Sequence, residues 1–160
     1  FSLAAHYRRD KHAERQDGFY NPGAVAYSEP WQETVEDTYS LAAENRFAFT
    51  PALSLTLGVS YDWRDLKKAE EFTIPPARFF EYPIANADAF NWQGRLDWQP
   101  DDATGLHVSV SRRARFPTIF ERFSTQFGNA ASNPALNPER SVNYEIGGSH
   151  DFGTLRAEAA

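Results

Sequence analysis

Cysteine is absent from the 160 residues, which excludes disulfides and thiolate metal sites within this chain. Long apolar runs are also missing, and none approaches the roughly 18 residues that a transmembrane helix needs. This absence excludes a helical membrane protein. It leaves the membrane itself open, because a barrel strand crosses a bilayer with only about 9–11 alternating residues. Phe1 is preceded by no basic n-region or cleavage site, so targeting cannot be read directly.

An excess of basic residues is lacking as well. The chain has 16 Lys and Arg against 22 Asp and Glu, a formal net charge of −6. Nucleic acid is therefore not an expected partner, since phosphate binding requires a clustered basic face and the charges here are interleaved. Aromatic residues, by contrast, make up 15% of the sequence, and disordered chains are poor in them. The composition favours a folded domain.

Apolar and polar residues alternate strictly from Leu53 to Arg64. Neighbouring side chains of a strand point to opposite faces, so this segment predicts a strand with one apolar face that ends in Tyr61 and Trp63. A membrane barrel places such aromatics in a girdle at the interface with water. A similar alternation predicts further strands, the first and last of them incomplete, at Phe1–Arg8, Thr38–Phe47, Phe90–Gln99, Leu106–Arg115, Val142–Phe152 and Leu155–Ala160.

The connections between these predicted strands alternate in length. The short connections are rich in turn residues and comprise Thr50–Ala52, Pro100–Gly105 and Asp151–Thr154. The long connections each exceed about 20 residues, which is unusual in a compact domain, and comprise roughly Asp10–Glu36, Leu66–Asp88 and Phe116–Glu139. Short turns at one edge and long loops at the other are typical of outer-membrane barrels. The fold class we predict is all-β, an antiparallel up-and-down meander of about seven strands within a large outer-membrane β-barrel.

Few residues suggest catalysis. Ser149, His150 and Asp151 are the residue types of a hydrolytic triad, but adjacent residues of a strand point to opposite faces and cannot converge. The four histidines lack the paired spacing of a zinc site. The acidic pairs Glu70–Glu71 and Asp101–Asp102 fall in predicted connections, where solvated charge explains them. We therefore expect no enzyme activity, no metal site and no cofactor.

The most specific string follows the predicted strand Leu106–Arg115. It reads RARFPTIFERF from Arg113 to Phe123 and STQFGNAASNPALNPERSVNYEIGG from Ser124 to Gly148. It resembles the barrel of the TonB-dependent receptor family, in which Arg-x-Pro-Thr-x-x-Glu leaves one strand and Asn-Pro-x-Leu-x-Pro-Glu-x-Ser-x-x-Tyr-Glu-x-Gly enters the next. Phe116 departs from the family, which usually has a small residue there. The matching positions are Arg115, Pro117, Thr118, Glu121, Asn133, Pro134, Leu136, Pro138, Glu139, Ser141, Tyr144, Glu145 and Gly147.

Elementary geometry agrees with this resemblance. Pro138 cannot donate a backbone hydrogen bond, so the strand should begin after it. Tyr144 should then face lipid and Glu145 the lumen, where we expect Glu145 to pair with Arg113 and Arg115 because buried charges need partners. Such pairs would hold neighbouring strands in register. The glycines at 147 and 148 should relieve crowding inside the strand.

The resemblance implies an N-terminal plug domain, a TonB-binding box and a barrel of about 22 strands with an aromatic end. None of these is found in the chain, and its last residues fall within a predicted strand. We therefore interpret residues 1–160 as a partial receptor barrel, an internal segment from the C-terminal half that lacks the plug domain.

The function implied is that of a bacterial outer-membrane receptor and transporter for a scarce nutrient, above all a ferric siderophore, energised by the TonB system. Its partners would be outer-membrane lipid and lipopolysaccharide, the TonB complex through the missing plug region, and the small-molecule nutrient. Aromatic and Arg residues of the loops are candidate ligand contacts, because planar ligands stack on aromatics and anionic ones pair with Arg. These candidates are Phe79, Phe80, Tyr82, Phe120, Arg122, Phe123 and Phe127. The same residues could instead pack the loops together or contact lipopolysaccharide.

Two alternatives remain open at this point. A soluble β-barrel or β-sandwich binding module would also show alternating strands, but it would seal Leu55, Leu57, Trp92 and Trp98 inside a core. A complete small outer-membrane barrel of about eight strands with an adhesive or structural role is the other.

Overall fold

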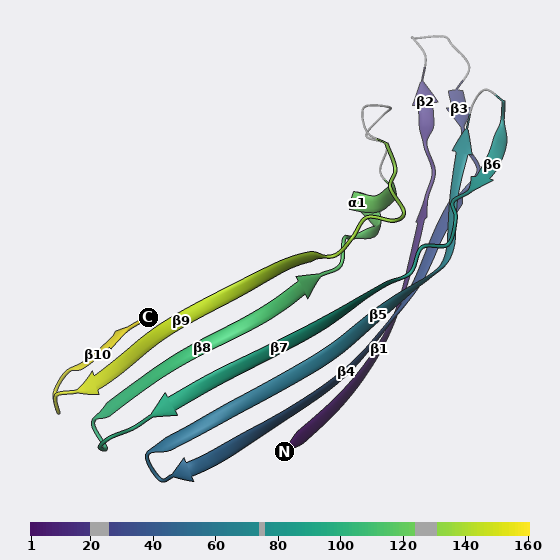
Figure 1. Ribbon diagram of the computed structural model, residues 1–160. Coiled ribbons are helices and arrows are strands. Elements are labelled where there is room, and N and C mark those ends of the chain that lie inside the picture. Colours follow the sequence, from purple (N-terminus) through teal and green to yellow (C-terminus); the bar gives the residue numbers. More distant parts are fainter. Residues whose placement is uncertain (20–25, 74–75, 124–130) are drawn as a thin grey trace.

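The computed structural model describes residues 1–19, 26–73, 76–123 and 131–160. They form one long curved sheet, with a short helix and a small hairpin at one end (Figure 1). No helix in these ranges is long and apolar enough to span a membrane. The elements in chain order are β1 (Ser2–Glu14), β2 (Asp17–Phe19), β3 (Ala26–Ser28), β4 (Gln32–Thr50), β5 (Leu53–Thr73), β6 (Arg78–Glu81), β7 (Ala87–Trp98), β8 (Thr104–Arg115), α1 (Ile119–Phe123), β9 (Glu139–Asp151) and β10 (Arg156–Ala159).

The main sheet has the order β1-β4-β5-β7-β8-β9-β10, and each strand runs antiparallel to its neighbours. Strand β6 pairs with the far end of β5, and β2 pairs with β3 in a separate hairpin. The predicted all-β antiparallel meander is therefore confirmed. Its short turns are also where the sequence places them: Gly153, with a φ of 89°, donates its N–H to Asp151 Oδ1 at 2.7 Å.

The strands at the long-loop end extend further than their alternation indicates. β4 has 19 residues and β5 has 21, about twice the 9–11 that cross a bilayer. The expectation that loops begin at Asp10 and Leu66 is thus wrong, since β1 continues to Glu14 and β5 to Thr73. In these extensions the strands are joined by ion pairs, including Lys11–Glu33 at 2.7 Å. Polar side chains can occupy both faces where both meet water, so the period-two pattern fades although the strand continues.

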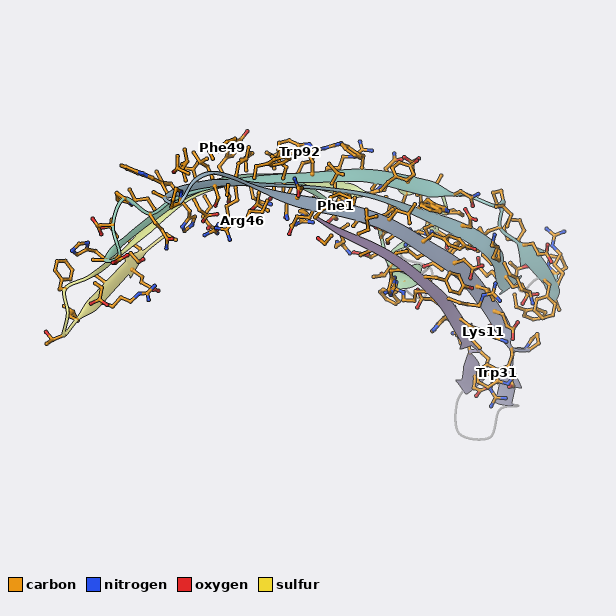
Figure 2. The ribbon with its side chains drawn as sticks, turned by 90° about the horizontal axis from the view of Figure 1, so that it is seen from below. Phe1, Lys11, Trp31, Arg46, Phe49 and Trp92 are labelled. Atoms are coloured by element: carbon orange, nitrogen blue, oxygen red, sulfur yellow. The ribbon has the colours of Figure 1, made fainter. Side chains whose placement is uncertain are left out.

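The register of the sheet aligns the residues of each face across successive strands. One row is entirely apolar and crosses β4, β5, β7, β8 and β9 at Phe47, Leu55, Leu96, Val108 and Ile146. The neighbouring row on the opposite face is polar and consists of Arg46, Thr56, Arg95, Ser109 and Glu145. Figure 2 shows Phe49 and Trp92 on the convex face and Arg46 on the concave face. The sheet is a curved wall, apolar outside and polar inside.

This wall encloses very little apolar core. Among the described residues the buried hydrophobic ones are Leu66, Ala69 and Ala89. The accessible surface is 11203 Å², whereas a compact chain of this mass would expose about 8,100 Å². Leu57 and Trp98 are 45% and 47% exposed on the convex face. The barrel hypothesis predicts this placement, and a soluble module with a sealed interior would require the opposite.

An aromatic cluster marks the end of the apolar face towards the long loops. Tyr7, Tyr39 and Trp63 lie side by side on β1, β4 and β5, with ring centroids 5.1 and 5.4 Å apart. Tyr61 lies 5.9 Å from Trp63, so both residues of the predicted girdle belong to the cluster. Tyr7 also donates a hydrogen bond to Asp37 at 3.0 Å. Rings with a polar tip suit this boundary, because one end can contact hydrocarbon and the other water.

Adjacent cysteines would test the two faces. Val108→Cys should react with a lipid-phase probe, and its matched neighbour Ser109→Cys with a water-soluble one, because the two side chains lie on the convex and concave rows. The chain has no native cysteine to interfere. Labelling would be measured on the intact protein in membranes. Protection of the first cysteine from both probes would contradict the outward placement of this row.

Candidate functional site at the long-loop end

The helix α1 begins at a capping box. Thr118 Oγ1 accepts a hydrogen bond from the Glu121 N–H at 3.2 Å, and Glu121 Oε2 accepts one from the Thr118 N–H at 2.7 Å. This reciprocal pair satisfies two backbone donors that a helix start leaves without partners. Pro117 precedes the cap and can donate no hydrogen bond of its own. The Pro-Thr-x-x-Glu positions therefore define where the chain turns from β8 into α1.

Arg115 joins the two halves of the family motif. Its Nη1 and Nη2 each donate to Glu121 at 2.9 Å, and its Nε donates to Glu139 at 3.1 Å. The last residue of β8 is thus tied both to α1 and to the first residue of β9. Arg115 lowers the pKa of Glu121 to about 2, with help from the Thr118 hydrogen bonds. The pKa of Arg115 is raised by the same two carboxylates.

The second half of the motif leads the chain back into the sheet. The Asn133 N–H donates to the Arg122 carbonyl at 2.7 Å, and the Leu136 N–H donates to the Asn133 carbonyl at 3.1 Å. β9 starts at Glu139, directly after Pro138, which confirms the predicted start of the strand. Along β9, Tyr144 is opposite Val110 on the convex face, as expected. Pro134 lies in the turn that precedes this strand.

The predicted partners of Glu145 are wrong. Glu145 contacts His107 Nε2 at 2.7 Å, while Arg113 donates to Gln93 and Arg115 to Glu121. The register explains the difference: Glu145 is opposite Ser109, and Arg113 is opposite Ser141, four residues further along. Gly147 is opposite His107, and a Cβ there would lie 2.5 Å from the imidazole. Glycine therefore does relieve crowding here, and it leaves room for His107.

The segment Phe116–Phe123, which follows β8, lies on the concave side of the wall, so that α1 is near the extended ends of β1, β4 and β5 (Figure 1). Arg64 of β5 donates to the Pro117 carbonyl, and Arg122 of α1 contacts Glu36 of β4 at 3.3 Å. The Arg122 side chain is only 1% exposed, and this burial lowers its pKa. A buried ion pair thus joins the third connection to the inner wall.

Some of the candidate ligand residues come together in space. Tyr82 lies 5.2 Å from Phe123 and 5.0 Å from Phe80 between ring centroids, which joins the second and third connections. Phe79 instead contacts Phe72, at 5.4 Å. Phe120 is 66% exposed, whereas Arg122 is buried against Glu36 and beneath the Phe123 ring. Phe127 lies outside the described residues.

A cavity of about 460 Å³, here called the aromatic cavity, lies beside Tyr82 and Phe123. It is between the ends of β1, β4 and β5 and the helix α1. Its apolar lining comes from Phe72, Tyr82, Ile119, Phe120 and Phe123. The Tyr82 hydroxyl donates a hydrogen bond to Glu71, and burial raises the pKa of Tyr82 to about 12. The tyrosine is therefore a neutral donor at physiological pH. The rest of the lining is polar and rich in acidic residues, which are Glu14, Asp17, Glu29, Glu70 and Glu71.

His150 contacts Thr104 Oγ1 at 2.9 Å, on the strand beside its own. Among the described residues no three His, Asp or Glu side chains gather as ligands for a metal ion. Glu36 and Arg64, which anchor the third connection, were not among the residues that the sequence singled out. Alternation puts Arg64 on the polar face, but nothing in the sequence indicates that Glu36 and Arg122 meet it.

The contacts of Glu121 with Arg115 and Thr118 should depend on pH. A carboxyl with a lowered pKa contributes stability above its ordinary pKa, and this contribution is lost as the pH falls through the folded-state value. We expect the start of α1 to stay ordered down to pH 4 and to loosen as the pH falls towards 2. Hydrogen exchange of residues 115–123 in the intact protein would measure this. E121Q should loosen the segment at neutral pH, whereas E139Q should loosen it less because it leaves the capping box intact. Equal hydrogen exchange in wild type and E121Q would contradict a stabilising role for the Glu121 contacts.

Comparison with known proteins agrees with this geometry. The family model described as "TonB dependent receptor-like, beta-barrel" matches residues 1–160. A "Probable TonB-dependent receptor" of Haemophilus influenzae is 39% identical over 59 residues, which are 37% of this chain and 6% of that protein. The solved structure "Copper transporter OprC" has a TM-score of 0.76 and 18% identity over 98% of this chain and 26% of that one, a likeness of fold alone. The chain therefore spans a small part of either relative. TonB-dependent receptors are transport proteins of the bacterial outer membrane and not enzymes. The chain belongs to this family and forms a section of its outer-membrane β-barrel wall.

Proposed function

We propose that residues 1–160 are one section of the barrel of a receptor that takes up a scarce nutrient across the outer membrane, energised by the TonB system. The observation that carries this proposal is the division of the sheet into two faces, in a chain whose whole length matches the family. Up to the aromatic cluster the convex face is apolar except at Asn45 and Arg112, and the concave face is polar. The plug domain and the contact with TonB would lie elsewhere in the same protein. The section would supply inner wall and loops, and the plug would supply the movable barrier.

The nutrient we propose is a ferric siderophore, taken as an intact chelate. Tyr82, Phe123 and Phe120 around the aromatic cavity favour a ligand with flat organic groups. A receptor for bare copper, the metal in the name of the structural neighbour, is the second candidate. Soft thiolate and thioether ligands select copper(I), and the chain contains neither cysteine nor methionine. The residues of this section therefore favour a chelated metal over a bare one.

We propose outer-membrane lipid and lipopolysaccharide as the partners of the convex face. Apolar residues up to the aromatic cluster would contact hydrocarbon. Beyond the cluster the same face carries ion pairs, of which Arg9–Asp37 at 2.7 Å and Lys11–Glu33 at 2.7 Å are examples. Charged groups of both signs at this level suit the charged headgroups of lipopolysaccharide and their counterions.

The intact protein should fractionate with the outer membrane and support uptake that stops when the TonB system is inactivated. The measurement is accumulation of radiolabelled iron, supplied as a panel of ferric siderophores, in cells with and without the receptor gene. A protein recovered in the soluble periplasm would contradict the placement in the membrane. Uptake of free copper but of none of the siderophores would contradict the proposed substrate.

Loss of the Tyr82 or Phe123 ring beside the aromatic cavity should weaken ligand binding. Y82A or F123A should raise the dissociation constant between about two-fold and ten-fold, which corresponds to the loss of one aromatic contact. The control is F152A, which removes an exposed ring in the turn between β9 and β10 at the opposite edge of the wall. Binding would be measured by fluorescence quenching on the purified receptor. Equal affinities for all variants would mean that Tyr82 and Phe123 only pack the loops together.

A further inference from the structure

A second cavity, of about 740 Å³, lies on the concave side of the wall below the third connection. β1, β4 and β5 form one side of it, and the segment Phe116–Phe120 forms the other. Its lining combines Phe116 and Phe120 with polar and charged residues of both signs. The basic residues are Arg8, Lys11 and Arg64, the acidic ones are Asp10, Glu36 and Asp62, and Thr38 and Ser40 supply hydroxyl groups. No residue predicted as a ligand contact lines it except Phe120.

Arg64 is the central cation of this second cavity. Its side chain is 4% exposed, and its Nη1 donates to the Pro117 carbonyl. Its Nε and Nη2 are buried without a hydrogen-bond partner. Thr38 is directly opposite Arg64 in the register of β4 and β5, and its Oγ1 is also buried and unpartnered. Three donors from two neighbouring strands are thus unsatisfied at one place, beside one acceptor without a hydrogen bond, Glu36 Oε2. Leaving buried donors unpaired is unfavourable, so the excess of donors favours an added acceptor.

The buried charges next to one another at this place, Glu36, Arg64 and Arg122, have a net positive sum. Glu36 is the carboxylate that both buried arginines share, at 3.5 Å from Arg64 and 3.3 Å from Arg122. Arg122 also has two buried nitrogens, Nε and Nη2, without hydrogen-bond partners. One carboxylate between two buried guanidinium groups leaves an excess positive charge within this trio, and buried charges require compensation. The other charged residues of the lining balance one another, with Arg8 and Lys11 against Asp10 and Asp62.

We propose that this cavity binds an oxyanion, a carboxylate or phosphate-type group of a small-molecule ligand, with Arg64 and the Thr38 hydroxyl as its donors. A guanidinium group presents a planar fork that matches the two oxygens of a carboxylate. The Phe116 ring, 4.9 Å from the guanidinium carbon, covers this fork and must turn aside to admit the anion. The inference rests on the proposed receptor function and narrows its substrate to ligands that carry acidic groups.

The test is direct binding of citrate to the intact purified receptor in detergent, measured by titration calorimetry with glucose as the uncharged comparison. R64Q should weaken citrate binding by about ten-fold or more, the expected loss for a hydrogen bond to a charged group. E36Q keeps a hydrogen-bonding side chain but removes the competing negative charge, so it should strengthen binding. General destabilisation would not produce these opposite signs.

Two further variants sharpen the assignment. R46Q removes an arginine of the same concave face that donates to Ser54, and it should leave citrate affinity unchanged. F116A removes the covering ring and should accelerate association. Absence of citrate binding to wild type, or a change in the same direction for R64Q and E36Q, would overturn the proposal and assign the arginines to holding the loop. Neither result would affect the receptor function, because membrane fractionation and uptake are measured independently of citrate binding.

Discussion

Backbone hydrogen bonding in hydrocarbon is the constraint on which the rest of this structure depends. Lipid offers no donors or acceptors, so each strand that crosses it must satisfy its backbone by pairing with neighbouring strands. Pairing in a continuous antiparallel register also aligns side chains, which is why Phe47, Leu55, Leu96, Val108 and Ile146 form one outward row over five strands. A shift of a single residue in any pair would turn a whole apolar set inward. The chemistry of the wall therefore follows from its register.

Beyond the aromatic cluster water can satisfy the backbone, so the strands no longer need an apolar outer face. Both faces of β1, β4 and β5 can meet water, so charged residues such as Lys11, Glu33 and Lys68 continue the strands through cross-strand pairs. The helix α1 lies on the concave side, where Arg122 forms an ion pair with Glu36. Arg115 then secures both ends of that connection through Glu121 and Glu139. The family motif thus links the end of β8, the helix α1 and the start of β9 through Arg115.

The two cavities at this end differ in the ligand chemistry that we propose for them. We assign flat groups to the aromatic cavity, with Tyr82 and Phe123, and an anionic group to the cavity at Arg64. Phe120 lines both, so a single ligand could contact the two together. A chelate with planar and acidic groups would satisfy both cavities. The shared element is α1, whose position depends on the capping box of Thr118 and Glu121.

The sequence by itself determined the strands of the wall, their two faces and the start of β9 after Pro138, because period-two alternation and proline geometry are local properties. It failed beyond the bilayer, where Asp10 and Leu66 were assigned to loops, since water on both faces removes the alternation. The partner of Glu145 also required the register, which aligns it with Ser109 and places Arg113 too far away. Only the tertiary structure brought Glu36, Arg64 and Arg122 together. They come from three segments, and their meeting depends on how a loop folds over a curved wall, which no local pattern records.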